Sequence, residues 1–285
     1  PDGLQQGFLN FLFLGRMLIH PDGLAADPAF QFGGESVLDT DDLFYYGNSQ
    51  GGIAGGALTA IATDFTRSVL YVAGMNYSTL LTRSVDFDTY QQFLYPSYPD
   101  EMSRPAMFAL MQMMWDRGEP NGYANNMTDN PLPGTPPHKV LIEMAYGDHQ
   151  VANVATEVEA RTIGAPLRSP ALDLNRLPAG IEYPDPFYGH EALGDLSGPA
   201  ADGNGYFVWD IGPKRVESNV DYGTDPPPLT DLPPDDSYGV DPHDTVIRSS
   251  PVIRKQIADF LKTNGKITDP CGNHPCYAAG WMGAP

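Results

Sequence analysis

The sequence has 285 residues, of which 41% are hydrophobic, enough to build the core of one large domain or of two small ones. Its 16 basic and 36 acidic residues give a net charge of −20, which repels phosphate backbones and anionic lipid surfaces. We therefore expect no nucleic-acid partner. No apolar run approaches the roughly 18 residues of a membrane-spanning helix, so no membrane span is expected.

The acidic residues are mostly Asp in loops rich in Pro and Gly, a balance typical of a secreted protein or of one adapted to high salt. We expect an extracellular or periplasmic protein. The two cysteines, Cys271 and Cys276, are close enough to form a disulfide loop within a C-terminal tail, residues 266–285. Reduced thiols and a metal site that includes His274 are the alternatives, although a zinc site needs a fourth ligand.

The first predicted element is a helix over Leu4–Ile19, which is apolar nearly all round and should therefore be packed on most sides. A short strand is predicted at Leu43–Tyr46, where aromatic and apolar residues gather. The helix expected from Gly52 to about Ala62 has small residues that would let it lie very close to a sheet. Further apolar runs predict strands at Ser68–Ala73, Lys139–Tyr146 and Tyr206–Trp209.

Strands separated by helices predict an α/β fold with a mostly parallel sheet and helices on both faces. Residues 1–74 and 131–265 are expected to form this core. A helix is plausible over Val151–Arg161, whereas the segment Gly212–Asp241 is too rich in proline for regular structure. The last helix is sharply signalled, with Ser250 as its N-cap, Pro251 in its first position and Gly265 beyond its end.

About 65 residues separate the second and third strands, more than a simple crossover needs. We expect residues 75–130 to form a helical cap or lid inserted into the core. The residues at one helical face could pack against a core, or their pliable methionines could line an apolar substrate pocket. This face consists of Met107, Leu110, Met111, Met114 and Trp115.

The segment Gly47–Gly51 reads Gly-Asn-Ser-Gln-Gly and matches the G-x-S-x-G pentapeptide of a nucleophile elbow. A serine turned sharply between a strand and a helix has strained backbone angles, and glycine neighbours let chain segments crowd there. The predicted strand before Ser49 and the small-residue helix after it are the context that this motif requires. The alternative is a serine in an ordinary glycine-rich turn.

A serine hydroxyl is a poor nucleophile near neutral pH, so it needs a base and an acid that orients the base. Asp148 directly follows the third predicted strand, at the same sheet edge as Ser49; the alternative is a turn aspartate. His243 lies just before the last helix and is the favoured base, unless it is a loop imidazole paired with Asp241 or Asp244. The other histidines are disfavoured by their order or position: His20, His138, His149, His190 and His274.

These features, in this order, resemble the α/β-hydrolase family over about Asp39–Gly265. The resemblance implies a Ser-His-Asp triad, with Ser49 as nucleophile, Asp148 as orienting acid and His243 as general base. The backbone N–H of Gln50 would be one oxyanion donor. The implied activity is that of a carboxylesterase or lipase, which cleaves small esters through an acyl-enzyme and needs no cofactor and no metal.

The substrate is expected to be a small-molecule ester with an apolar group. Residues beside the elbow and in the insertion would receive that group: Asn48, Met75, Met111 and Trp115, with aromatic residues such as Tyr77, Phe93 and Tyr95.

The chain departs from the family pattern before the elbow. A complete member has several strands there, and a loop among them supplies the second oxyanion N–H; here about 40 residues precede the elbow strand and hold essentially one helix. We therefore expect the C-terminal part of a larger hydrolase, whose sheet is completed by an upstream segment or by a second chain.

Two other functions stay open at this point. The same triad would serve a serine peptidase, which the sequence does not distinguish from an esterase. The chain could also be a non-catalytic module that retained the fold, with Ca²⁺ bound by loops around Asp235, Asp236 and Asp241, although EF-hand spacing is absent.

Overall fold

The computed structural model describes residues 2–173, 176, 187, 189–190, 196, 200–212, 241–244 and 250–283. The main sheet has five strands in the order β3-β4-β5-β7-β9, and all its pairings are parallel. The predicted α/β fold with a parallel sheet is confirmed at this level. Residues 213–240 of the proline-rich segment, which include Asp235 and Asp236, lie outside the described residues.

The strands of the main sheet lie close to the predicted ones, and the fifth was not predicted. Strand β5, in the middle, is buried along almost its whole length, because helices cover both faces of the sheet. The bounds are β3 (Tyr45–Asn48), β4 (Arg67–Tyr71), β5 (Lys139–Ala145), β7 (Gly205–Asp210) and β9 (Cys276–Tyr277). Two small antiparallel pairs lie outside it: β1 (Gln31–Phe32) with β2 (Glu35–Ser36), and β6 (Ala200–Ala201) with β8 (Ile267–Thr268).

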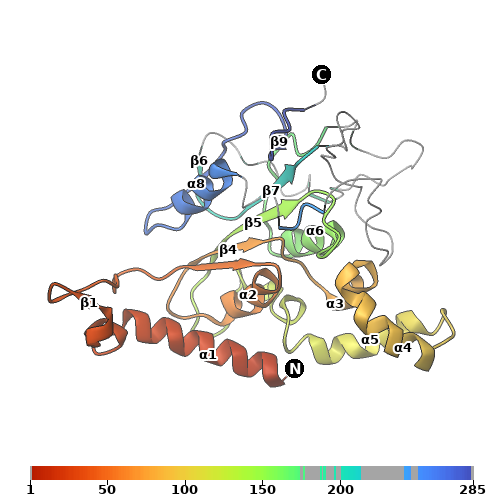
Figure 1. Ribbon diagram of the computed structural model, residues 1–285, viewed down its shortest axis with the longest axis horizontal. Helices are drawn as coiled ribbons and strands as arrows, with labels where there is room; N and C mark the ends of the chain where they lie inside the picture. Colours follow the sequence, from red (N-terminus) through yellow and green to blue (C-terminus); the bar gives the residue numbers. More distant parts are fainter. Residues whose placement is uncertain are drawn as a thin grey trace.

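Alternate residues along the strands face two separate cores. Leu70 and Ile142 pack with α2 (Gln50–Ile61) and α6 (Asn153–Thr162) on one face. Val69 and Leu141 pack with α8 (Pro251–Phe260) on the other. Figure 1 shows α8 on the opposite side of the sheet from α2 and α1 (Asp2–Ile19).

Helix α2 lies as close to the sheet as its small residues predict. A Cβ added at Gly52 would lie 2.7 Å from the carbonyl oxygen of Tyr71, and one at Gly55 would lie 2.4 Å from the ring of Tyr45. A larger side chain at either position would push the helix away from β3 and β4.

Helix α8 begins as the sequence predicts. The hydroxyl of Ser250 accepts a hydrogen bond from the backbone N–H of Ile253 (3.3 Å), and Pro251 occupies the first turn.

Helix α1 is not packed on most sides, so that prediction was wrong. Phe8 is the residue of this helix that is buried, where it packs on Ala57 and Leu58 of α2. The side chains of five other apolar residues are 45–61% exposed: Leu9, Phe11, Phe13, Leu14 and Met17. The pattern failed because α1 covers α2 from outside, at the end of the sheet where β3 has no further described strand beside it.

The segment between β4 and β5 contains α3 (Tyr77–Leu80), α4 (Asp88–Ser97) and α5 (Arg104–Trp115), which extend to one side of the sheet in Figure 1. The single apolar face predicted for α5 is split. Met107, Met111 and Trp115 pack toward a cluster around Phe87, whereas Leu110 and Met114 are exposed. Met107, Met111 and Trp115 are four residues apart and form one row that faces the cluster, whereas Leu110 and Met114 lie beside this row.

The described chain also contains short 3-10 turns: Leu24–Ala26, Pro28–Phe30, Leu81–Arg83, Val85–Phe87, Pro120–Gly122 and Ala124–Asn126.

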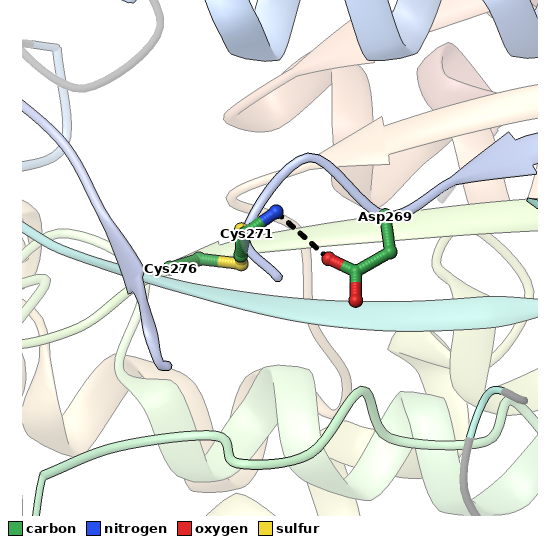
Figure 2. Close-up of side chains that lie close together, drawn as sticks. All are labelled: Asp269, Cys271 and Cys276. Atoms are coloured by element: carbon green, nitrogen blue, oxygen red, sulfur yellow. Dashed lines mark hydrogen bonds between the residues drawn. A yellow bond between two sulfur atoms is a disulfide. The ribbon is translucent and has the colours of Figure 1, made fainter. Parts of the chain in front are cut away.

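Cys271 and Cys276 form a disulfide, which accounts for both sulfurs. Together with Asp269 they are the metal-type cluster found among the described residues, but the Asp269 carboxylate accepts the N–H of Cys271 (2.9 Å) as a turn residue does (Figure 2). The alternative of a zinc site therefore has no free thiolate to serve as a ligand. His274 instead stacks on Tyr277.

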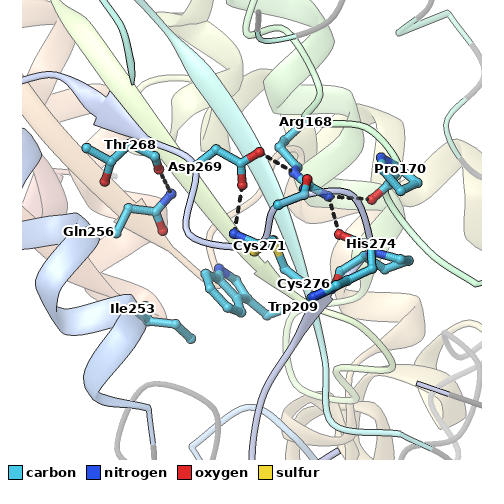
Figure 3. Close-up of a disulfide and its surroundings, with 12 residues drawn as sticks. Arg168, Pro170, Trp209, Ile253, Gln256, Thr268, Asp269, Cys271, His274 and Cys276 are labelled. Carbon is cyan, nitrogen blue, oxygen red and sulfur yellow. Dashed lines mark hydrogen bonds and ion pairs between the residues drawn. A yellow bond between two sulfur atoms is a disulfide. The ribbon is translucent and has the colours of Figure 1, made fainter. Parts of the chain in front are cut away.

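The buried guanidinium of Arg168 holds the disulfide loop against the core. It donates to the carbonyl oxygens of Pro170 (2.9 Å) and His274 (2.6 Å) and pairs with Asp269 (3.1 Å), as Figure 3 shows. The segment expected as a tail thus contributes β8 and β9 to the described structure. None of the helices in the described part of the chain is long and apolar enough to cross a membrane.

Glu143 carries a fully buried carboxyl in the middle of β5. Its Oε2 accepts the indole N–H of Trp209 (2.5 Å), and its Oε1 has no hydrogen-bond partner among the described residues. Burial raises the pKa of Glu143 to about 8, from an ordinary value of 4.5.

We expect Glu143→Gln to make stability less dependent on pH. The folded state holds the Glu143 proton more tightly than the unfolded state does. The stability that this proton contributes in the wild type is therefore fully present below about pH 4.5 and is lost as pH rises through about 8. The free energy of unfolding of the variant, taken relative to the wild type, should therefore be higher at pH 8 than at pH 5 by on the order of a few kcal/mol. Thermal melts across this range measure the effect, with exposed Glu35→Gln as control. The expectation is wrong if the melting temperatures of Glu143→Gln and of the wild type change with pH in the same way.

Candidate active site

Ser49 occupies a strained turn between β3 and α2, with φ 58° and ψ −125°. A positive φ at a residue with a side chain costs on the order of 1–3 kcal/mol and persists only where the surroundings hold it. The Ser49 N–H donates to the carbonyl of Tyr71 (3.0 Å), and its own carbonyl accepts from Ile53 N–H (2.9 Å). At Gly47 a Cβ would lie 2.1 Å from the carbonyl oxygen of Gly51, so only glycine fits there.

The structure brings Ser49, His243 and Asp148 into one hydrogen-bonded line. The hydroxyl Oγ of Ser49 lies 2.7 Å from His243 Nε2, and His243 Nδ1 lies 2.8 Å from Asp148 Oδ2. The side chains of Asp148 and His243 are buried, whereas Ser49 is half-buried. In the tautomer that this network implies, Ser49 donates to Nε2 and Nδ1–H donates to the carboxylate. Such a line can draw the hydroxyl proton toward the ring and hold the resulting imidazolium.

The loop after β5 fixes the carboxyl of Asp148. Its Oδ1 accepts the N–H groups of Gln150 and Val151 (2.8 Å each), which leaves Oδ2 for His243. Gly147 makes the turn with φ 86°, and its N–H donates to Asn153 Oδ1 (2.8 Å). The carboxylate is therefore held rigidly from the backbone side.

Asp241 positions His243, a role that the sequence analysis missed. Its Oδ1 accepts the backbone N–H of His243 (3.1 Å) and that of His149 (3.3 Å), so it joins the two loops that carry the base and the acid. The signal was present in the spacing, because an Asp two residues before the histidine can form a side-chain turn with its N–H. His243 is thus not a loop imidazole paired with Asp241 or Asp244, because its Nδ1 binds Asp148.

The protonation of His243 reflects opposing effects. Burial acts to lower the pKa of the imidazole, but the hydrogen bond and the charge of Asp148 together with the charges of Asp241 and Asp244 outweigh it, so that the pKa of His243 is raised. The group therefore changes charge above the ordinary value of 6.5 for histidine.

A cavity of about 850 Å³ opens beside Ser49. Met111 and Trp115 line it, as predicted, and so do Gln50 and Phe93. Its other described lining is largely apolar or aromatic and comes mainly from the segment between β4 and β5: Ile53, Tyr77, Leu80, Leu81, Ser84, Asp86, Phe87, Tyr90, Leu94, Ser97, Tyr98, Gln150 and Val151.

Three residues expected at this cavity are not among its described lining. Met75 is 4% exposed because its side chain belongs to the core cluster between the sheet and α6, and its backbone N–H bonds the carbonyl of Ala155 (3.1 Å). Asn48 ends β3 beside the cavity without lining it. Tyr95 packs on Phe87, with the guanidinium of Arg104 over its ring.

Tyr77 connects the cavity wall to the elbow. Its hydroxyl accepts a hydrogen bond from Gln50 Nε2 (2.9 Å), and its ring meets Trp115 edge-on with centroids 5.9 Å apart. Gln50 is the first residue of α2, where backbone N–H groups have no partner within the helix. The Tyr77 contact therefore fixes the side chain of Gln50 at the N-terminus of α2.

Behind Tyr77 lie two fully buried carboxyls, Glu119 and Glu159, that no sequence pattern marked. Glu119 accepts from Gln112 and from the N–H of Asn121 (3.0 Å), and burial raises its pKa to about 7. Both oxygens of Glu159 are without a hydrogen-bond partner among the described residues, and burial raises its pKa well above the ordinary range. They were missed because hydrophobic periodicity does not register buried acids that lie far apart in the sequence.

Comparisons of the chain with protein-family models, with curated proteins and with solved structures found no match.

We expect Asp148→Asn to lower the pKa of His243, because the hydrogen bond and the charge that raise it are weakened or removed. The ring proton resonances of His243, followed by NMR against pH, measure this shift directly. Exposed His20 serves as the internal reference. An unchanged His243 titration in a folded Asp148→Asn protein would show that the two side chains do not interact in solution.

Proposed function

We propose that the protein is a serine hydrolase that cleaves carboxylic esters. The observation that carries the proposal is the hydrogen-bonded line from Ser49 through His243 to Asp148, with distances of 2.7 and 2.8 Å, at the edge of a largely apolar cavity. The strained elbow, the parallel sheet and the order Ser, Asp, His along the chain support assignment to the α/β-hydrolase family. The disulfide is compatible with an extracellular location, which we propose with it.

In the proposed mechanism, Ser49 Oγ attacks the ester carbonyl while His243 Nε2 takes its proton. Asp148 stabilises the imidazolium that forms, and the N–H of Gln50 donates to the oxyanion. His243 then gives the proton to the departing alcohol, which leaves an acyl group on Ser49. His243 then takes a proton from a water molecule, whose oxygen attacks the acyl carbon. The bond from that carbon to Ser49 Oγ breaks, His243 returns the proton to Oγ, and the acid leaves.

A labelling experiment tests the nucleophile. A fluorophosphonate probe should attach to Ser49 in the wild type and to no residue in Ser49→Ala, and ester turnover should fall by about 10⁴-fold or more. Ser36→Ala, in the exposed β1–β2 hairpin, should retain both labelling and turnover. Peptide mapping of the labelled protein identifies the site. Folded native material, with any additional segment or chain it contains, that is neither labelled nor active on p-nitrophenyl butyrate would refute the proposal.

We also propose that an additional polypeptide, an upstream segment or a second chain, pairs with the open edge of β3. Among the described residues β3 pairs only with β4, and an apolar groove of about 230 Å³ separates its edge from α1. Phe11 and Leu14 of α1 line this groove and are exposed. An open strand edge beside exposed apolar side chains is a surface that proteins usually cover. The same polypeptide would supply the second oxyanion donor.

Intact-mass measurement and peptide mapping of the native, active material test this second proposal. We expect a stoichiometric additional segment or chain, and protection of the β3 amides from hydrogen exchange in its presence. A monomer of these 285 residues alone that is well folded and fully active would overturn it.

A further inference from the structure

The cavity beside Ser49 is walled by aromatic rings. Six of them come from the segment between β4 and β5: Tyr77, Phe87, Tyr90, Phe93, Tyr98 and Trp115. The face of an aromatic ring carries a partial negative charge and attracts organic cations. One such cation–π contact is present in the same segment, where the Arg104 guanidinium lies 3.9 Å from the ring centroid of Tyr95.

Asp86 is the one charged residue among the described residues that line this cavity. Its N–H bonds the hydroxyl of buried Ser84 (3.2 Å), which fixes the backbone at that point of the wall. Its carboxylate is exposed and has no hydrogen-bond or ion-pair partner in the described part of the chain. The carboxylate is thus available to a ligand.

The charge of the whole chain acts in the same direction. A net charge of −20 produces a negative potential that concentrates cations and repels anions at the mouth of a cleft. A neutral apolar ester would contact the same rings but would gain nothing from Asp86 or from this potential. An ester with a carboxylate, sulfate or phosphate group would be opposed by both.

We propose that the cavity selects esters that carry an organic cation of the quaternary ammonium type and rejects esters that carry an anion. This inference rests on the proposed ester hydrolysis at Ser49 and names the substrate class for that site. The cationic group lies among the aromatic rings, within reach of the Asp86 charge, while the ester carbonyl lies at Ser49.

Binding of three matched compounds tests the charge preference without relying on catalysis. Phenyltrimethylammonium, its uncharged isostere tert-butylbenzene and the anion benzenesulfonate are titrated into the wild-type protein by calorimetry at low ionic strength. The cation should bind about tenfold more tightly than the isostere, and the anion most weakly. The cation should also slow fluorophosphonate labelling of Ser49, which locates it in this cavity.

Two substitutions separate the local carboxylate from the general field. Asp86→Asn should weaken cation binding by about threefold and leave tert-butylbenzene binding unchanged. Asp22→Asn removes the same charge at an exposed position outside the cavity lining and should have no effect. Equal or tighter binding of tert-butylbenzene, or cation binding that is insensitive to Asp86→Asn, would overturn the proposal.

Hydrolysis of the uncharged ester p-nitrophenyl butyrate distinguishes the two possible failures. If this ester is hydrolysed at Ser49 while the cation has no binding advantage, the charge preference is wrong and the proposed function stands. If the cation binds preferentially and blocks the cavity but no ester is cleaved, the ester-hydrolase assignment fails and the charge preference is supported.

Discussion

The close contact between α2 and the strands beneath it is the constraint on which the rest of the site depends. Gly52 allows the helix to approach the carbonyl of Tyr71, and Gly47 allows the chain to turn back on Gly51. Between them Ser49 is forced to a positive φ, and its hydroxyl lies 2.7 Å from the ring of His243. A helix about 1 Å farther from the sheet would move Oγ out of hydrogen-bond range of the His243 ring, which is itself held in place by Asp148 and Asp241.

Parallel pairing then determines which other groups can reach that hydroxyl. The carboxyl ends of β3 and β5 lie at one edge of the sheet, so the loop that carries Asp148 opens beside the elbow. His243 comes from a separate connection, and Asp241 ties that connection to the loop of Asp148. The geometry of the line therefore rests on backbone N–H groups held by carboxylates rather than on the three side chains alone.

Local signals made much of this arrangement predictable from the sequence, and long-range packing made the rest unpredictable. The elbow pentapeptide, the Ser250 cap and the apolar strands each depend on neighbours within a few residues, and the structure contains the corresponding turn, helix start and strands. The exposure of α1, the burial of Met75 and the unpredicted strand β9 depend on surfaces that lie far away along the chain. An apolar pattern indicates that a residue can be buried, but not which partner is present to bury it.

The buried acids and the buried histidine limit the useful pH range from opposite sides. His243 must be neutral to accept a proton, and its neighbouring carboxylates raise its pKa, so low pH removes the proposed base. Glu119 and Glu143 hold protons in the folded state to about pH 7 and 8, so the fold loses stability as pH rises through these values. Because Glu119 also supports the wall that carries Tyr77, loss of its proton would disturb the cavity before the whole fold is lost. The proposed base therefore favours higher pH and the stability of the fold favours lower pH, and on the high-pH side the limit comes from carboxyl groups that take no part in the proposed chemistry.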